Sequence, residues 1–504
     1  MINRSVGIRS LAVSFPSIIR TNNYWHRHYP ELVAQAEPKR ARLYRPAVST
    51  SEINGLEIWS QEVKPYLSDP FRGNVERRVL SPDESSLTLE CQAARDTLAA
   101  AKLAPEEVEL AIVTSLFSEQ IISGNAAYLT CQLELRCPVW NLDSTCSSAL
   151  VALQNAYALV QTGEYNNVLV VISHIGSKSV DEGDTLSWSM GDGAGAFVVD
   201  TLKPNQGILG TKVVPTAVTS SAYLHELTTD TDGKPQIRTR TGKNASLLAE
   251  TAVDFVRTCC AGAIAAAGVT LDQIDFFAFN TPTAWYANVC TRALGIEPER
   301  TINLYPQYAN IGPVLPIANL YHATLEGKIR ENDLVLVYTN GAGATAAATI
   351  MCWGDVALGQ VPAPPIGLAQ EQKRLDQADH SHSEAQIEND SLSRAKLIAA
   401  APAERQQLLE TYLMAWLASS LQFPLSNLNS QQPLALSLDS LMAFVLRSRI
   451  ETDLQVRVPM ENFFGSNNIA QLVELVLKQL ALTNVIESDS VVITEDDERE
   501  KLSF

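Results

Sequence analysis

The chain has few features of proteins that bind nucleic acids or cross membranes. Its 38 Lys and Arg residues are outnumbered by 56 Asp and Glu residues. The resulting net charge of −18 argues against nucleic acid or an anionic membrane surface as a partner. No uninterrupted run of about twenty apolar residues occurs that would span a bilayer. The first residues contain only interrupted apolar runs, so no secretory signal is expected.

Cysteine is sparse and scattered. The eight cysteines form no CxxC pair and no dense framework, so neither a metal site nor a disulfide scaffold is indicated. A reducing cytoplasm fits this usage best. The composition, 46% hydrophobic and 19% charged, is that of a soluble globular protein, and a length of 504 residues predicts at least two domains.

The composition changes sharply after residue 355, which predicts a domain boundary. Residues 356–394 combine prolines with a polar run that lacks apolar periodicity, as flexible linkers do. Helical spacing returns over 395–480 and predicts a small all-α domain. The last residues, 481–504, form an acidic tail, interpreted either as a solvated disordered end or as a docking segment for another protein.

The region 1–355 contains an internal repeat. The segment "AAAKLAPEEVELAIVTS" (99–115) lies over "AAAGVTLDQIDFFAFNT" (265–281), and "MGDGAGAFVV" (190–199) lies over "NGAGATAAATI" (340–350). In both halves, about 1–200 and 201–355, strands alternate with helices. Runs such as "NVLVVIS" indicate strands buried on both faces.

The repeat predicts an α/β architecture of two similar halves in five layers. Cys146 and Asn310 fall at equivalent positions of the two halves. A pseudo-twofold arrangement would bring these two residues together, so the repeat also predicts a site.

Cys146 is a candidate nucleophile. It stands just before an apolar-periodic stretch, in "NLDSTCSSALVAL" (141–153). The amides and macrodipole at a helix N-terminus are expected to lower the pKa of the thiol and favour the thiolate. The alternative is a buried structural cysteine.

Several ordered motifs resemble the ketoacyl-acyl-carrier-protein synthase III branch of the thiolase-like superfamily. They are "FPSIIRTN", "STCSSAL", "SMGDGAGAFVV", "YANIGPV" and "NGAGATA", and the resemblance spans roughly residues 3–355. It implies a five-layered thiolase-like fold, a homodimer, and a transferase that holds an acyl group as a thioester on Cys146. It also implies an oxyanion hole formed by the amides of Cys146 and Ala342.

One position departs from the family pattern. The family pairs a histidine with an asparagine; Asn310 is in place, but Asn280 stands where the histidine is expected. An amide donates a hydrogen bond but does not take up a proton near neutral pH. Loss of such a group typically costs on the order of 10² to 10⁴ in rate, so decarboxylative condensation is expected to be impaired. His174 and His225 are candidate substitutes, with structural or surface roles as the alternative.

Arginines near the expected entrance form a second candidate site. Arg72, Arg77 and Arg78 occur in "DPFRGNVERRVL" and are expected to contact the phosphates of an acyl-CoA or an acidic carrier protein. A solvated surface role is the alternative. The stretch from Trp25 to Trp59 is interpreted as an insertion.

The segment "PLALSLDSLMAFVLRSRI" resembles a polyketide-type acyl carrier domain. This resemblance places 4′-phosphopantetheine on Ser440, attached by a phosphopantetheinyl transferase. A helix N-terminus favours the phosphodiester. The alternative is that Asp439 or Ser440 only caps the helix.

The two resemblances together predict an acyltransferase. It would exchange an acyl group between Cys146 and the arm on Ser440 in polyketide or related natural-product biosynthesis. The donor would be an acyl-CoA or a separate acyl carrier protein, and the acidic tail would recruit downstream assembly-line enzymes. Two alternatives remain: carbon–carbon bond formation, as an initiation condensation or a non-decarboxylative Claisen reaction, and a condensation-incompetent dimeric scaffold that presents the carrier domain.

Overall fold

The computed structural model describes residues 4–36, 55–120, 123–229, 235–367, 394–421, 446–463 without 448, 452 and 457, and 468–489. The chain forms two compact units, residues 1–376 and residues 377–504, and the division falls within the stretch 356–394. Within the described ranges, no helix combines the length and apolar character needed to cross a membrane.

Six strands of the first unit form one large sheet in the order β14-β1-β7-β6-β4-β5. The strands are β1 (Val6–Ser14), β4 (Ala111–Leu116), β5 (Val139–Asn141), β6 (Asn167–Ile175), β7 (Asp192–Thr201) and β14 (Ala357–Leu358). Every residue of β6 is buried, because helices cover both faces of the sheet at its centre.

A second sheet repeats this arrangement in the order β11-β12-β13-β8. Its strands are β8 (Gly207–Pro215), β11 (Phe276–Phe279), β12 (Leu334–Asn340) and β13 (Thr345–Cys352). The row β1-β7-β6-β4 and the row β8-β13-β12-β11 both contain two antiparallel pairs followed by one parallel pair. The two repeated halves expected from the sequence are therefore confirmed.

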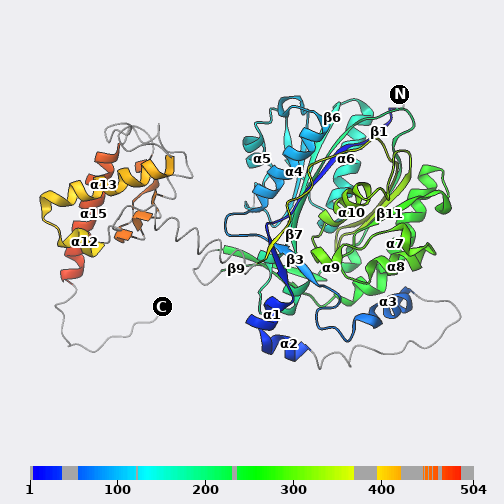
Figure 1. Cartoon of the computed structure of the whole chain (residues 1–504), viewed down its shortest axis with the longest axis horizontal. Coiled ribbons are helices and arrows are strands. Elements are labelled where there is room, and N and C mark those ends of the chain that lie inside the picture. Colours follow the sequence, from blue (N-terminus) through cyan, green and yellow to red (C-terminus); the bar gives the residue numbers. More distant parts are fainter. Residues whose placement is uncertain are drawn as a thin grey trace, which may run out of the picture. The chain divides into compact units, whose positions relative to one another are not determined.

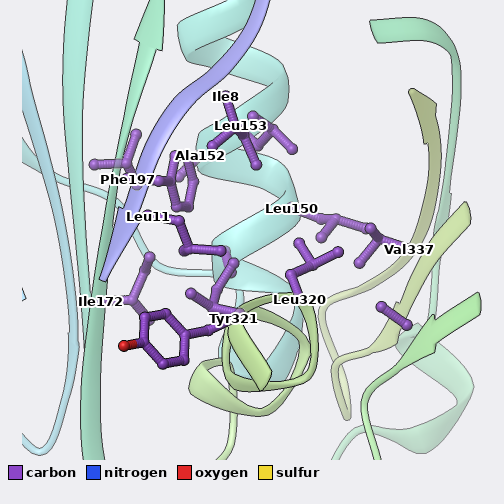
Figure 2. Packing of buried hydrophobic residues seen from close by; sticks show 14 of the residues in the cluster. Ile8, Leu11, Leu150, Ala152, Leu153, Ile172, Phe197, Leu320, Tyr321 and Val337 are labelled. Atoms are coloured by element: carbon purple, nitrogen blue, oxygen red, sulfur yellow. The ribbon is translucent and has the colours of Figure 1, made fainter. Parts of the chain in front are cut away.

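Helices fill the space between the sheets and cover their outer faces. Helices α6 (Ser148–Thr162) and α10 (Val314–Leu325) lie between the sheets and pack against apolar residues of both (Figures 1 and 2). Helices α4 (Ser86–Ala101) and α5 (Ala126–Leu133) cover the first sheet. Helices α7 (Ser246–Ala267) and α8 (Tyr286–Leu294) cover the second. The result is the expected five-layered fold.

Smaller elements surround these layers. They are β2 (Ile18–Thr21), β3 (Glu76–Val79) and β15 (Ile366–Gly367) in a three-stranded sheet, the hairpin β9 (Tyr223–Thr229) and β10 (Pro235–Thr241), and helix α9 (Tyr305–Tyr308).

The expected insertion contributes helices α1 (Asn23–His28), α2 (Pro30–Ala36) and α3 (Gly55–Val63). Helix α1 is anchored on Glu182, whose carboxylate accepts hydrogen bonds from Tyr24 at 2.6 Å and from Arg20 at 2.7 Å. Helix α3 packs against α8, where Trp59 lies edge-on to Trp285 with ring centroids 6.0 Å apart.

The second unit is helical in its described part, with α12 (Arg394–Ala399), α13 (Pro402–Leu421) and α15 (Ile469–Asp489) around an apolar core. Helix α15 runs through 481–489, so the first part of the expected acidic tail belongs to a helix. Residues 490–504 lie outside the described residues, as does Ser440 with the rest of 422–445.

Candidate active site

Cys146 lies on a tight turn between β5 and α6. Thr145 adopts a left-handed backbone conformation with φ 51°, and residues Thr145–Ser147 form a short 3-10 turn before α6 begins. Asp143 accepts a hydrogen bond from the Thr145 amide at 2.8 Å, and Ser148 Oγ donates to the Thr145 carbonyl at 2.7 Å. A non-glycine residue in this conformation costs of order 1–3 kcal/mol, so these contacts hold a strained turn that carries the thiol.

The thiol of Cys146 is protonated at neutral pH. Burial and the carboxylate of Asp143 raise the pKa of Cys146 from 9.0 to about 11, while its own backbone amide lowers it. The expectation of a lowered pKa is therefore wrong. A helix terminus contributes roughly 0.3–1 kcal/mol, less than the ~1.4 kcal/mol of one pKa unit, whereas desolvation shifts buried groups by several units.

The glycine-rich turn of the second half packs directly on the Cys146 turn. A methyl group on Gly341 would come within 2.4 Å of Thr145 Oγ1 and 2.7 Å of the Ser144 carbonyl. Ser147 Oγ also donates to the Thr345 carbonyl at 2.5 Å. The next amide, that of Ala342, donates to no acceptor among the described residues. An N–H at the edge of this turn is thus available to a ligand oxygen.

Asn310 stands on the turn that precedes α10. Its backbone pairs with the segment before β7, since the Asn310 amide donates to the Ser189 carbonyl at 2.9 Å. Its side-chain Oδ1 accepts from the Gly312 amide at 2.9 Å. The side-chain nitrogen has no acceptor within the part of the chain that is described, so Asn310 presents a hydrogen-bond donor.

Asn280 connects the two turns that carry Cys146 and Asn310. It follows β11 and is 1% exposed. Its Nδ2 donates to the Cys146 carbonyl and to the Gly312 carbonyl, both at 3.4 Å. Its Oδ1 is buried without a partner among the described residues. A flipped amide would set Oδ1 against two carbonyl oxygens, so the side chain of Asn280 keeps no free donor.

Neither candidate histidine is hydrogen-bonded to Cys146 or Asn280 in the described structure. His174 is buried under Gly312; its Nδ1 pairs with the Gly191 carbonyl at 3.0 Å, and burial lowers its pKa to about 4. His225 pairs through Nδ1 with Thr239 Oγ1 at 3.0 Å, and burial lowers its pKa also. Both rings are held by these contacts.

Two of the three entrance arginines are turned inward. Arg77 is fully buried, donates to Asn22 Oδ1 at 2.8 Å and the Trp188 carbonyl at 2.9 Å, and lies 4.3 Å from the ring of Trp25. Arg78 donates to the Pro16 carbonyl at 2.7 Å. Burial lowers the pKa of both. The expected phosphate or carrier contact does not fit these two residues, because the insertion covers Arg77.

Arg72 is the arginine of this group that remains partly exposed. Its guanidinium donates a hydrogen bond to the Tyr66 carbonyl at 3.1 Å. The backbone of Arg72 is left-handed, with φ 54°, and its side chain is partly exposed. Of the entrance arginines, it alone keeps access to solvent for the role expected from the sequence.

Sequence reasoning missed Tyr223, the first residue of β9. Burial and the interaction with Cys146 raise the pKa of Tyr223 to about 12. The segment "SSAYLHELTT" drew attention only for its histidine, and no local pattern marks its tyrosine as a neighbour of Cys146.

Family models match both units. Residues 141–215 match the model for 3-oxoacyl-[acyl-carrier-protein] synthase III, and residues 264–353 match the model for its C-terminal part. Residues 412–476 match the model of a phosphopantetheine attachment site.

Similar proteins point in the same direction. The chain is 28% identical over 283 residues to β-ketoacyl-[acyl-carrier-protein] synthase III of Aquifex aeolicus. The aligned region covers 56% of this chain and 88% of that protein. It is 26% identical over 290 residues to the synthase III of Symbiobacterium thermophilum, covering 55% and 87%.

Solved structures share the fold of the first unit. The synthase III of Thermus thermophilus superposes with a TM-score of 0.56 at 26% identity and covers 69% of this chain and 99% of its own. The Aquifex aeolicus enzyme superposes with a TM-score of 0.54 at 24% sequence identity, and the match covers 69% of this chain and 100% of that enzyme. A variant of Xanthomonas campestris OleA superposes with a TM-score of 0.56 at 18% sequence identity, and the match covers 70% of this chain and 98% of that protein.

Proposed function

Because the chain joins a transferase domain of the ketoacyl-acyl-carrier-protein synthase III type to a phosphopantetheine attachment domain, we propose that it moves an acyl group between Cys146 and a 4′-phosphopantetheine arm on Ser440. The Cys146 sulfur attacks the thioester carbon, the bond from that carbon to the departing sulfur breaks, and the proton of Cys146 ends on the departing thiol. The Ala342 amide supports this step, because it donates to no acceptor among the described residues and can therefore stabilise the oxyanion of the tetrahedral intermediate.

The orientation of Asn280 is the observation that carries this proposal. Decarboxylative condensation places negative charge on the malonyl thioester oxygen. At this position the side-chain nitrogen of Asn280 is committed to two carbonyls and the free atom is Oδ1. Without a free donor at this position a developing enolate loses one stabilising hydrogen bond, whereas thioester exchange on Cys146 does not require a donor there.

Transfer within one chain is favoured by concentration. The nucleophile and the carrier domain belong to a single polypeptide, so the second thiol is supplied intramolecularly, at a high effective concentration. We place the reaction in the cytoplasm, in polyketide or related natural-product assembly, with an acyl-CoA or a separate carrier protein as donor.

Intact-mass measurement tests the proposal. The full chain is loaded by a phosphopantetheinyl transferase and incubated with a panel of acyl thioesters. Acyl groups are expected on both Cys146 and Ser440. Cys146→Ala should abolish delivery to the arm, and Ser440→Ala should leave the acyl group on Cys146. Unchanged loading of Ser440 in Cys146→Ala would show that the transfer route is wrong.

Carbon–carbon bond formation is the second candidate function. The free side-chain nitrogen of Asn310 favours it, because one of the two donors expected in such a site is present. It predicts release of carbon dioxide from malonyl substrates or an elongated acyl chain on Ser440. A scaffold without chemistry is disfavoured by the packed turns around Cys146.

A homodimer forms part of the proposal. Strand β5 is an edge strand of the first sheet, and Trp140 on it is 39% exposed. An open strand edge with an exposed aromatic side chain favours pairing with a second copy. Sedimentation of the full chain is expected to give twice the mass of one chain.

A further inference from the structure

Three of the four amides in the glycine-rich turn, residues 341–344, have a hydrogen-bond acceptor within the chain. The pairs are the Gly341 amide with the Thr345 carbonyl at 2.8 Å, the Gly343 amide with Thr219 Oγ1 at 2.9 Å, and the Ala344 amide with the Gly341 carbonyl at 3.3 Å. The amide of Ala342 donates to no acceptor among the described residues. The turn therefore leaves one N–H open to a bound ligand.

The direction of this N–H is set through the carbonyl of the same peptide group. The Gly341 carbonyl and the Ala342 amide belong to one trans peptide, which is planar, so its oxygen and its N–H point in opposite directions. Thr216 Oγ1 donates to that oxygen at 2.5 Å. A hydrogen bond that holds the oxygen on one side of the peptide therefore fixes where the N–H points on the other side.

The Thr216 hydroxyl is itself held in place. Thr216 directly follows β8, is fully buried, and donates through its amide to the Ala344 carbonyl at 3.1 Å. Thr219 Oγ1, which accepts from the Gly343 amide, donates to the Thr216 carbonyl at 2.8 Å. The two threonines thus bind the carbonyls of Gly341 and Ala344 and the amide of Gly343, on both sides of the open N–H.

The peptide needs this outside support because Gly341 has no side chain to restrict its backbone. Gly341 lies against the turn that carries Cys146, where a methyl group on it would come within 2.4 Å of Thr145 Oγ1 and 2.9 Å of Ser147 Oγ. The close approach of the two turns therefore requires glycine at this position. A hydrogen bond from a neighbouring segment then supplies the rigidity that a side chain would otherwise give.

We propose that Thr216 is a positioning residue for acyl transfer, and the proposal rests on the function assigned above to Cys146. Its hydroxyl holds the Gly341–Ala342 peptide so that the Ala342 N–H donates to the acyl oxygen as this oxygen becomes negatively charged. The hydrogen bond to the carbonyl also polarises the peptide and makes its N–H a stronger donor. Thr216 acts through this peptide and exchanges no proton or bond with the substrate.

Acylation and alkylation of Cys146 distinguish this role, because only acylation creates an oxyanion. In the full chain, acylation by an acyl-pantetheine thioester is followed by intact mass over a range of ester concentrations, and alkylation by iodoacetamide is followed separately. Thr216→Val keeps the shape of the side chain and removes its hydroxyl. It should lower the maximal acylation rate by about 10- to 10²-fold, at an unchanged half-saturating concentration, and leave the alkylation rate unchanged.

Three further variants separate the hydroxyl from packing. Thr216→Ser keeps the hydroxyl and should acylate at close to the wild-type rate. Thr216→Ala removes the hydroxyl without the second methyl group of valine, and should be as slow as Thr216→Val. Thr291→Val, in α8, removes another buried hydroxyl, which donates to the Asn288 carbonyl at 3.0 Å, and should acylate at the wild-type rate.

Wild-type acylation in both Thr216→Val and Thr216→Ala would overturn the assignment of Thr216. An equal loss of acylation and alkylation would overturn it too, because the Cys146 turn itself would then have moved. The same holds for an equal loss in Thr216→Ser and Thr216→Val. In each of these cases the wild-type chain still forms acyl-Cys146. Failure of the wild-type chain to form acyl-Cys146 would instead refute the proposed transfer function, and the role of Thr216 would fall with it.

Discussion

The reactivity of Cys146 should rise tenfold per pH unit from neutral pH to about pH 10. The thiol has a pKa of about 11, about two units above its ordinary value of 9.0. Two units correspond to about 2.7 kcal/mol favouring the protonated form. At pH 7 the thiolate fraction is thus on the order of 10⁻⁴. Because the thiolate is the nucleophile, its fraction sets the rate.

The rate of Cys146 alkylation by excess iodoacetamide, measured under pseudo-first-order conditions at a series of pH values, tests this dependence. The modified peptides are separated, so that Cys146 is followed independently of Cys131, an exposed thiol that serves as an internal reference. The logarithm of the Cys146 rate should rise with unit slope and show no plateau below about pH 10. A plateau near neutral pH would refute the conclusion that burial dominates the helix terminus at this thiol.

The variant Asp143→Asn tests the second cause of the shift. It removes the charge that raises the pKa of Cys146 and keeps an oxygen able to accept from the Thr145 amide. Alkylation at fixed pH should become roughly three- to tenfold faster, which corresponds to half to one pKa unit. A slower reaction would mean that Asp143 acts through the shape of the turn.

Three further perturbations follow from the structure. Asn280→His should raise carbon dioxide release from malonyl substrates, measured with labelled malonyl thioester. No increase would show that another part of the site, and not Asn280, prevents decarboxylation. Gly341→Ala should lower acylation of Cys146 by at least about tenfold, by intact mass with unchanged circular dichroism, because its methyl group would meet Thr145. Glu90 is fully buried, and burial raises its pKa from 4.5 to about 7 although Ser115 and Ser173 donate to it. The folded state holds this proton more tightly than the unfolded state, so stability should fall as the pH rises from about 4.5 to about 7. Between pH 5 and pH 8 the wild-type free energy of unfolding, from urea titrations, should drop by about 2–3 kcal/mol relative to Glu90→Gln; parallel curves would contradict the shift.

Much of the fold was predictable because the chain repeats itself. The matching strand and glycine motifs predicted two similar halves, and the rows β1-β7-β6-β4 and β8-β13-β12-β11 have the same order and directions. Burial on both faces leaves continuous apolar runs such as β6, which are visible in the sequence. The insertion was visible only as a break in the pattern, and its anchoring on Glu182 depends on contacts between distant segments.

The sequence by itself determined the residue types at the site and the order of the motifs. It placed Cys146 before a helix and an asparagine at 280, and the repeat put Asn310 opposite Cys146. Identity and spacing of this kind are local properties, and they carry the resemblance to acyl-transferring enzymes.

Only the tertiary structure decided how these groups behave. Desolvation makes Cys146 a neutral thiol, and the carbonyls of two separate turns fix the amide of Asn280. A tryptophan of the insertion covers Arg77. Burial and the partners of a polar group depend on segments far apart in the chain, and no local pattern of residues encodes them.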